Sequence, residues 1–167
     1  ERLNAEVRLG DGMDVIEKNE IDSLSICGMG GQSIVRILSE HPNRLPQQIV
    51  LQPNKAIDSV RQWARDNGYW LTDEKCTGIK RRFEVLVFRR SGSSPDPVYQ
   101  KLDRAGLDES MGLMFGPWFL LRKDEQLLQR LAEEQRYLQA RPNLTETSQA
   151  RLETIRRLLT SDPFLRR

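Results

Sequence analysis

The feature that most restricts the fold of this chain is a run of apolar, β-prone residues that ends abruptly in a cluster of glycines. Ile21–Cys27 is followed directly by Gly28-Met29-Gly30-Gly31. The next segment, Gln32–Ser39, spaces its apolar residues as one face of a helix does. A strand, a tight turn and a helix in this order are typical of α/β folds. We therefore expect Ile21–Cys27 to be a buried strand.

β-prone apolar segments and segments with helical spacing alternate through the first half of the chain. This alternation predicts an α/β unit with a mostly parallel sheet. The last two predicted strands are close enough in sequence to form an antiparallel hairpin. Further strands are predicted at Glu6–Leu9, Gln48–Leu51, Tyr69–Cys76 and Phe83–Phe88, and helices at Met13–Lys18 and Ala56–Asn67.

The C-terminal part has a purely helical pattern from Leu120 onward, with leucines and isoleucines in two stripes. Pro142 interrupts the pattern, and Asn143 with Glu146 three residues later resembles a capping box. A turn this short predicts two antiparallel helices. We expect two domains, at residues 1–117 and 118–167. Residues 120–167 hold 10 basic and 7 acidic side chains, so this part is mildly basic.

The composition excludes several classes of protein. One His and two Cys leave no set of metal ligands and no disulfide framework, which favours a reducing, cytoplasmic location. No apolar stretch is long enough to span a membrane. No Ser–His–Asp or Cys–His arrangement suggests a nucleophile, and Cys27 is expected to be a core thiol. Because the first residue is Glu1, we interpret the chain as a piece of a longer one.

Three turns follow predicted strands, where ligands of open α/β sheets bind. They are Gly10-Asp11-Gly12, Cys27–Gly31 and Gln52-Pro53-Asn54. Glycines let the backbone approach a flat ligand closely, and Asp11 could accept hydrogen bonds from it. Each turn has a purely structural alternative: a helix cap for Asp11, a tight strand-to-helix turn for the glycines, and capping amides for Gln52 and Asn54. The three turns together predict a binding cleft.

Several segments carry a family resemblance. In chain order they are VRLGDGMDVI, IDSLSICGMGGQSIVRIL, IVLQPNKAIDSVRQWARDNGY and FEVLVF, followed by GPWFLL and a helical hairpin. Together they resemble the bacterial tRNA (adenine(22)-N1)-methyltransferase family. The resemblance implies a class I methyltransferase that uses S-adenosylmethionine. Its fold would be a Rossmann-like sheet followed by a C-terminal antiparallel coiled coil. Its substrate would be N1 of an adenine in tRNA.

The resemblance also implies roles for the turns. Asp11 matches the acidic residue that faces the cofactor's adenine, and the Gly28–Gly31 loop lies where the methyl donor meets the target base. The implied cofactor-binding residues are Gly10, Asp11, Gly12, Cys27 and Gly28, and the implied catalytic positions are Gly28, Met29, Gly30 and Gly31.

Contacts with tRNA are expected from the amides of the Gln52-Pro53-Asn54 turn, from the basic residues at 80–82 and from arginines of the C-terminal helices. A solvated helix face is the alternative for the tail arginines, because glutamates interleave with them. The expected RNA-binding residues are Gln52, Asn54, Lys80, Arg81, Arg82, Arg130, Arg136, Arg151 and Arg156.

One departure from the family is large. The Gly-Thr-Asp-His-type motif after the first strand, and the second strand with its ribose-binding acid, do not occur in this sequence. The chain therefore resembles a class I sheet from its third strand onward, and such a sheet would be split at its centre. Either the native chain is longer, which we favour, or self-association completes the sheet. We expect this piece to be inactive alone; the alternative function is a non-catalytic RNA-binding or scaffolding remnant.

Overall fold

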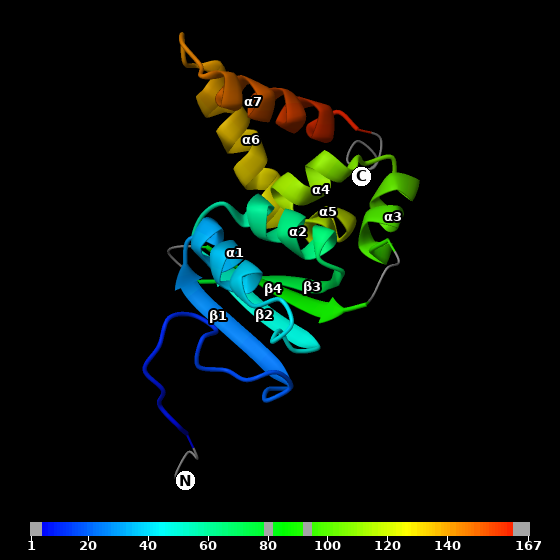
Figure 1. Ribbon diagram of the computed structural model, residues 1–167. Helices are drawn as coiled ribbons and strands as arrows, with labels where there is room; N and C mark the ends of the chain where they lie inside the picture. Colours follow the sequence, from blue (N-terminus) through cyan, green and yellow to red (C-terminus); the bar gives the residue numbers. More distant parts are fainter. Residues whose placement is uncertain (1–4, 79–81, 92–94, 162–167) are drawn as a thin grey trace. The chain divides into compact units, whose positions relative to one another are not determined.

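The computed structural model describes residues 5–78, 82–91 and 95–161. Contacts within the chain divide it into two compact units, Glu1–Gly92 and Ser93–Arg167 (Figure 1). The boundary expected after residue 117 stays a prediction; residue 117 is the first of α5 (Pro117–Leu121), which follows α4 (Glu109–Phe115) in the second unit. These two helices and α3 (Pro97–Arg104) all contact one another, which places them in one unit.

The first unit contains a four-stranded mixed sheet. The strands β1 (Ser23–Met29), β2 (Gln48–Pro53), β3 (Tyr69–Thr77) and β4 (Phe83–Arg90) are arranged in the order β1-β2-β4-β3. β1 and β2 pair in parallel, whereas β4 is antiparallel to both of its neighbours. The predicted β3–β4 hairpin is confirmed. The sheet is mixed rather than mostly parallel as predicted: two of the three pairings in the described sheet are antiparallel, because the hairpin inserts β4 between β2 and β3.

Two amphipathic helices cover one face of this sheet (Figure 1). α1 (Gly31–Glu40) connects the parallel pair, and α2 (Ile57–Asp66) follows β2. The predicted helical faces are confirmed, since the apolar side chains at helical spacing are buried. The core comprises Ile34, Ile37 and Leu38 of α1, Val60, Trp63 and Ala64 of α2, and Ile49, Leu51, Leu71, Leu86 and Phe88 of the sheet.

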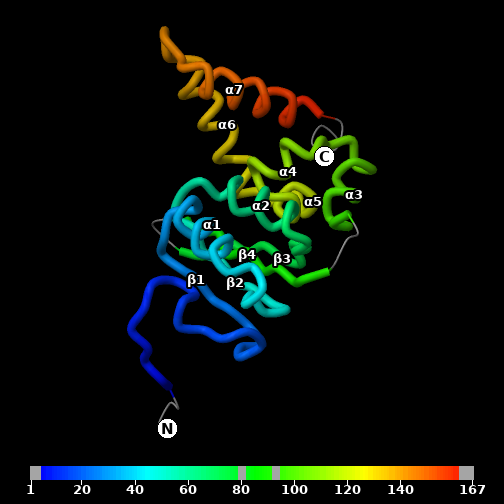
Figure 2. Tube along the Cα trace, in the orientation of Figure 1, coloured from blue at the N-terminus to red at the C-terminus, as the bar shows by residue number. Residues whose placement is uncertain are grey.

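The prediction of a buried first strand is wrong. Every residue of β1 is exposed or half-buried, because β1 lies at the edge of the described sheet and pairs only with β2. The strand predicted at Glu6–Leu9 is absent from the described residues, and Val7 and Leu9 are 96% and 102% exposed. Figure 2 shows this segment as an open trace. Self-association through the outer edge of β1 stays a prediction.

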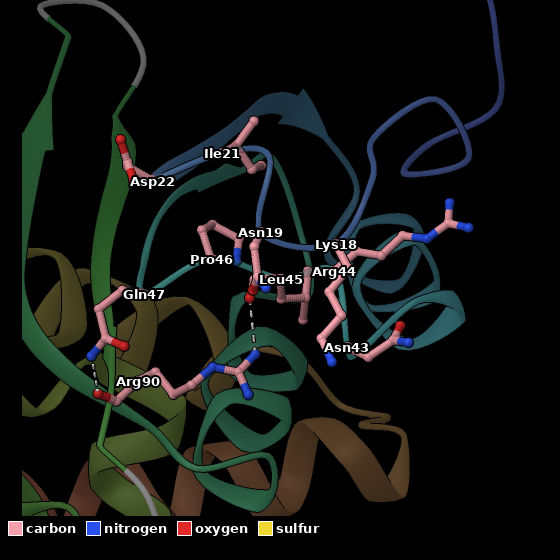
Figure 3. Close-up of a pocket in the computed structure, with 10 residues that line it drawn as sticks. All are labelled: Lys18, Asn19, Ile21, Asp22, Asn43, Arg44, Leu45, Pro46, Gln47 and Arg90. Atoms are coloured by element: carbon pink, nitrogen blue, oxygen red, sulfur yellow. Dashed lines mark hydrogen bonds between the residues drawn. The ribbon is translucent and has the colours of Figure 1, made fainter.

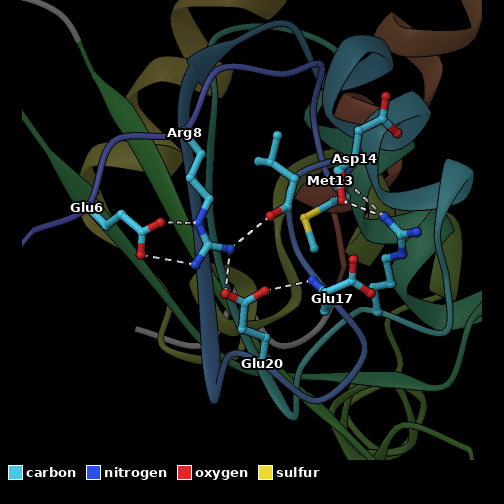
Figure 4. A network of polar contacts seen from close by, with 8 residues as sticks. Glu6, Arg8, Met13, Asp14, Glu17 and Glu20 are labelled. Atoms are coloured by element: carbon cyan, nitrogen blue, oxygen red, sulfur yellow. Dashed lines mark hydrogen bonds and ion pairs between the residues drawn. The ribbon is translucent and has the colours of Figure 1, made fainter.

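The segment before β1 is held by polar contacts and by one buried side chain (Figure 4). Arg8 pairs with Glu6 and Glu20 and donates a hydrogen bond to the Val15 carbonyl. The hydrogen bond from Arg8 lowers the pKa of Glu6. Met13 is buried, within a series of turns that replaces the helix predicted at Met13–Lys18. Two backbone hydrogen bonds between residues three apart close these turns: Asp14 N donates to Asp11 O, and Ile16 N donates to Met13 O.

A buried ion triad joins α2 to the sheet. Arg61 donates through Nε to Glu74 of β3 and through Nη2 to Glu84 of β4, at 2.7 Å in each case. Arg61 and Glu74 are 1% and 0% exposed. Burial alone would lower the pKa of Arg61, but the two carboxylates outweigh it and raise this pKa. The guanidinium therefore remains charged inside the protein.

The second unit consists of helices, each preceded by a side chain that caps it or by a glycine. α6 (Glu125–Gln139) and α7 (Glu146–Leu159) contact each other, and Leu127, Leu131, Leu152 and Ile155 are buried, as the stripes predicted. The cap predicted at Asn143 is wrong: the Thr145 hydroxyl accepts a hydrogen bond from the Ser148 amide, because the helix begins two residues later. Across the described ranges, no helix combines the length and apolarity that a membrane span needs.

The triad gives a first prediction. Arg61→Met should lower the free energy of unfolding by about 3–5 kcal/mol, because Glu74 and Glu84 would be left buried without a counter-charge. Arg65→Met is the matched control on the same helix; it pairs with the exposed Asp66 and should cost about 1 kcal/mol or less. Urea denaturation measures both. Equal, small effects would show that the triad does not stabilise the fold.

Candidate functional site

The turns after β1 and β2 lie side by side, because the two strands are parallel and end at the same edge of the sheet. Cys27 pairs with Gln52 and Met29 pairs with Pro53, so Gly28 is an extra residue between the two pairings. Its φ of 79° lies in the left-handed region, which favours glycine. The structure thus brings together two of the three turns predicted to form a site.

Two side-chain amides hold Gly28 at both of its backbone polar groups. The Gly28 amide donates to Gln52 Oε1 at 3.0 Å, and Asn54 Nδ2 donates to the Gly28 carbonyl at 2.5 Å. Gln52 Nε2 also donates to Asn54 Oδ1 at 3.2 Å, which closes the network. Gln52 and Asn54 therefore position the glycine loop. Their predicted contact with RNA stays a prediction.

The glycines of this loop differ in the space around them. A Cβ on Gly31 would lie 2.1 Å from the Ala56 carbonyl oxygen, so only glycine fits there. The Gly31 amide also donates to the Lys55 carbonyl at 2.8 Å. A Cβ on Gly28 would meet nothing within 4 Å, and one on Gly30 would meet the flexible end of Lys55 at 3.1 Å. The loop is thus packed at Gly31 and open at Gly28.

Asp11 lies beside α1 rather than within the amide network. Its side chain is 71% exposed and its carboxylate is 3.7 Å from Arg36. The turn is packed closely, since a Cβ on Gly12 would lie 3.2 Å from Ile37 and one on Gly10 would lie 2.1 Å from Val15. Gly12 also has a φ of 53°. The turn is therefore fixed against α1, and the role of Asp11 toward a cofactor stays a prediction.

Two residues next to the loop differ from the sequence-based expectations. Cys27 is exposed rather than a core thiol, because β1 is an edge strand, and its Sγ lies 3.6 Å from Ser25 Oγ. Lys55 was not predicted as a site residue, although it directly follows Gln52-Pro53-Asn54; its side chain adjoins Gly30. It adds a positive charge to the edge of the loop. The described residues contain no group of three or more His, Cys, Asp or Glu side chains suited to a metal.

Some of the basic residues predicted to bind RNA are exposed, whereas others already contact residues of the chain. Lys80 and Arg81 lie outside the described residues, whereas Arg82 and Arg130 make contacts and are half-buried. Arg151 pairs with Glu134 through two hydrogen bonds of 2.5 and 3.0 Å, which join α7 to α6. Arg136 and Arg156 are exposed, and Arg156 lies 3.8 Å from Glu153. These last two remain available to a partner.

The order of these turns matches a known family. The profile of the tRNA (adenine(22)-N(1))-methyltransferase family, TrmK, matches residues 2–161. The chain belongs to this family. The TrmK-family relative of Bacillus subtilis (strain 168), a tRNA (adenine(22)-N(1))-methyltransferase, is 32% identical over 143 residues. The alignment covers 80% of this chain and 55% of the relative, so the chain spans about half of the relative's length.

Solved structures show the TrmK fold directly. The crystal structure of the B. subtilis m1A22 tRNA methyltransferase TrmK matches with a TM-score of 0.73 at 28% identity, over 92% of this chain and 69% of that one. A Streptococcus pneumoniae protein in complex with S-adenosyl-L-methionine also has a TM-score of 0.73, at 23% identity, over 92% of this chain and 68% of that one. At this lower identity the likeness concerns the fold alone.

The packing around the TrmK-family glycine loop gives a second prediction. Gly31→Ala should lower the free energy of unfolding by roughly 1–3 kcal/mol, because the backbone of residues 55 and 56 must move to admit a methyl group. Gly30→Ala is the matched control, with φ and ψ of −71° and 144° that alanine adopts readily. It should cost less than about 0.5 kcal/mol. Thermal and urea denaturation measure the loss of stability in each variant. Equal losses in Gly31→Ala and Gly30→Ala would contradict the close packing at Gly31.

Proposed function

We propose that this chain is part of an enzyme that transfers a methyl group from S-adenosylmethionine to N1 of an adenine in tRNA. The observation that supports this most directly is the glycine loop after β1, held by Gln52 and Asn54 in a chain of the TrmK family. The B. subtilis relative is named for this activity. With tRNA as its substrate, the protein would act in the cytoplasm.

The residues at the strand ends suit S-adenosylmethionine. The S. pneumoniae protein of similar fold was crystallised with this cofactor. In our chain, Asp11 offers a carboxylate that is mostly exposed and could accept a hydrogen bond from an adenine amino group. The space above Gly28 is open where a side chain would otherwise stand. When bound, the cofactor supplies an activated methyl group on a sulfonium.

The role of the loop is to bring the two reacting atoms together. N1 of neutral adenine has a free lone pair, so the chain need not supply a strong base before attack. Transfer instead needs the reacting atoms aligned at about 3–3.5 Å, which a rigid loop without side chains permits. The Gly28 backbone is fixed at both polar groups by Gln52 and Asn54, so its position is set before the substrate arrives. A paired target base must first leave its duplex.

The second unit is the part that we propose to contact the tRNA body. α6 and α7 are joined by the Arg151–Glu134 pair and by buried leucines, an arrangement that supports an antiparallel coiled-coil hairpin. Arg136 and Arg156 are exposed, and such side chains bind phosphate groups of RNA without reading the base sequence. Arg151 already pairs with Glu134, so its predicted contact with RNA stays a prediction.

The decisive experiment is a methyl-transfer assay. We expect the protein containing this chain to label a tRNA with adenine at position 22 from radiolabelled S-adenosylmethionine, and to leave the same tRNA with guanine at this position unlabelled. The two transcripts differ at one base, so folding of the RNA is matched. Labelling of both tRNAs would exclude position 22 as the target. Binding of tRNA without any transfer would favour a non-catalytic RNA-binding protein.

Replacing the two exposed arginines tests the hairpin. The double variant Arg136→Gln/Arg156→Gln should weaken tRNA binding and reduce the slope of log affinity against log salt by about two, since two phosphate contacts are lost. Arg136→Lys/Arg156→Lys keeps the charge and should retain most of the affinity. The affinity for S-adenosylmethionine should not change in either variant. An unaltered salt slope would assign the hairpin to packing alone.

A further inference from the structure

A polar pocket lies at the end of the sheet opposite the glycine loop. It has a volume of about 630 Å³ and is formed by the segment before β1, the segment before β2 and the last residue of β4 (Figure 3). β1 has seven residues, so the pocket and the loop at its other end are separated by about 20 Å. The volume is within the range of ligand sites, and the location separates this pocket from the proposed methyl-transfer site.

Arg90 is fixed at the wall of this pocket. Its Nη2 donates to the Tyr69 hydroxyl at 2.7 Å and to the Leu45 carbonyl at 3.1 Å, and its carbon Cζ lies 4.8 Å from the centre of the Tyr69 ring. Gln47 Nε2 donates to the Arg90 carbonyl at 2.6 Å. Within the described residues Nη1 makes no hydrogen bond. The guanidinium is thus oriented in advance, with one donor group unused.

The positive charges of the pocket have no carboxylate partners among the described residues. Burial raises the pKa of Tyr69 despite the nearby Arg90, so the hydroxyl that Arg90 contacts is neutral at pH 7. Arg44 donates to the carbonyls of Met13 and Asp14, which are also neutral. Lys18 is exposed, and Figure 3 shows its side chain extending toward the Arg90 side of the pocket. Neutral partners orient these cations but leave their charge uncompensated.

The remaining lining indicates the kind of ligand. Asn19, Asn43 and Gln47 contribute amides that can donate hydrogen bonds, and Asp22 is the single carboxylate against three cations. In Figure 3 the Asp22 side chain points away from Lys18 and Arg90. A single carboxylate among three cations does not favour a divalent metal, and so polar a lining does not suit an apolar ligand. Guanidinium and ammonium groups with amide donors are the groups that bind phosphate.

We propose that this pocket binds the phosphate group of a nucleotide or of an RNA backbone. Arg90 would donate through its unused Nη1, Lys18 would supply a mobile positive charge at the rim, and the amides would complete the set of donors. The proposal does not rest on methyl transfer at the glycine loop, because the two sites lie at opposite ends of β1 and share no residue.

Titration with inorganic pyrophosphate tests the pocket. We expect saturable binding to the chain, with shifts of the Asn19, Asn43 and Gln47 side-chain amide signals in NMR spectra. Lys18→Gln should weaken this binding roughly tenfold, since one charge-assisted hydrogen bond is lost. Lys18 is exposed and makes no hydrogen bond or ion pair within the described residues, so the Lys18→Gln variant should keep the fold. Arg89→Gln, which removes the exposed neighbouring arginine of β4, is the matched control and should bind as the parent does.

Two results would overturn the proposal: the absence of saturable binding at millimolar pyrophosphate, or equal weakening by Lys18→Gln and Arg89→Gln. A competition experiment with tRNA then identifies the source of the phosphate. Displacement of pyrophosphate by tRNA, with weaker tRNA binding by Lys18→Gln, assigns the pocket to the RNA backbone. Binding of tRNA without displacement assigns it to a free phosphorylated ligand; both results support a phosphate site.

Discussion

The buried guanidinium of Arg61 is the interaction on which the geometry of the first unit depends. It is the point at which α2, β3 and β4 are joined, since it bonds Glu74 and Glu84 from neighbouring strands. Without it, two carboxylates on adjacent strands would be left buried with no counter-charge, at a cost of several kcal/mol. Because β2 pairs with β4, the turn after β2 inherits its position from this triad. A charged group in the core thereby links one helix and two strands of the first unit.

The glycine loop depends in turn on the position of β2. Gln52 and Asn54 can reach Gly28 only while β1 and β2 keep their parallel register, with Cys27 opposite Gln52. A Cβ is excluded at Gly31 because the backbone at Ala56, itself at a φ of 50°, approaches so closely. The amide network and this close approach fix the loop from two sides. The loop therefore has little freedom left to lose when a ligand binds, which favours precise positioning of two reacting atoms.

Much of this arrangement could be predicted from the local sequence. The features that could not be predicted all depend on residues that are distant in the sequence. The helices of the first unit were predicted because the spacing of residues such as Ile34, Ile37 and Val60 is a local property. The exposure of β1 was not predicted, because an apolar strand is buried only if another strand or helix packs against it. Arg61 likewise is of a residue type that is typical of the solvent-exposed face of a helix. Its burial depends on Glu74 and Glu84, which are 13 and 23 residues away in the sequence. The short helices α3 to α5 have too few turns to show a clear period.

The same limitation applies to the electrostatics. Counting charges along α6 and α7 treats Arg136 and Arg151 alike, but Arg151 is paired with Glu134 and Arg136 is exposed. The charge of Arg151 is already partly neutralised by Glu134, so the exposed Arg136 is the better candidate to bind phosphate. In the first unit, neutral partners leave Arg44 and Arg90 uncompensated near one end of β1. The distance of about 20 Å from there to the glycine loop corresponds to about six base-pair steps of a duplex at about 3.4 Å each. An RNA that contacts both ends would have to span this distance, whereas a small phosphorylated ligand has no such constraint.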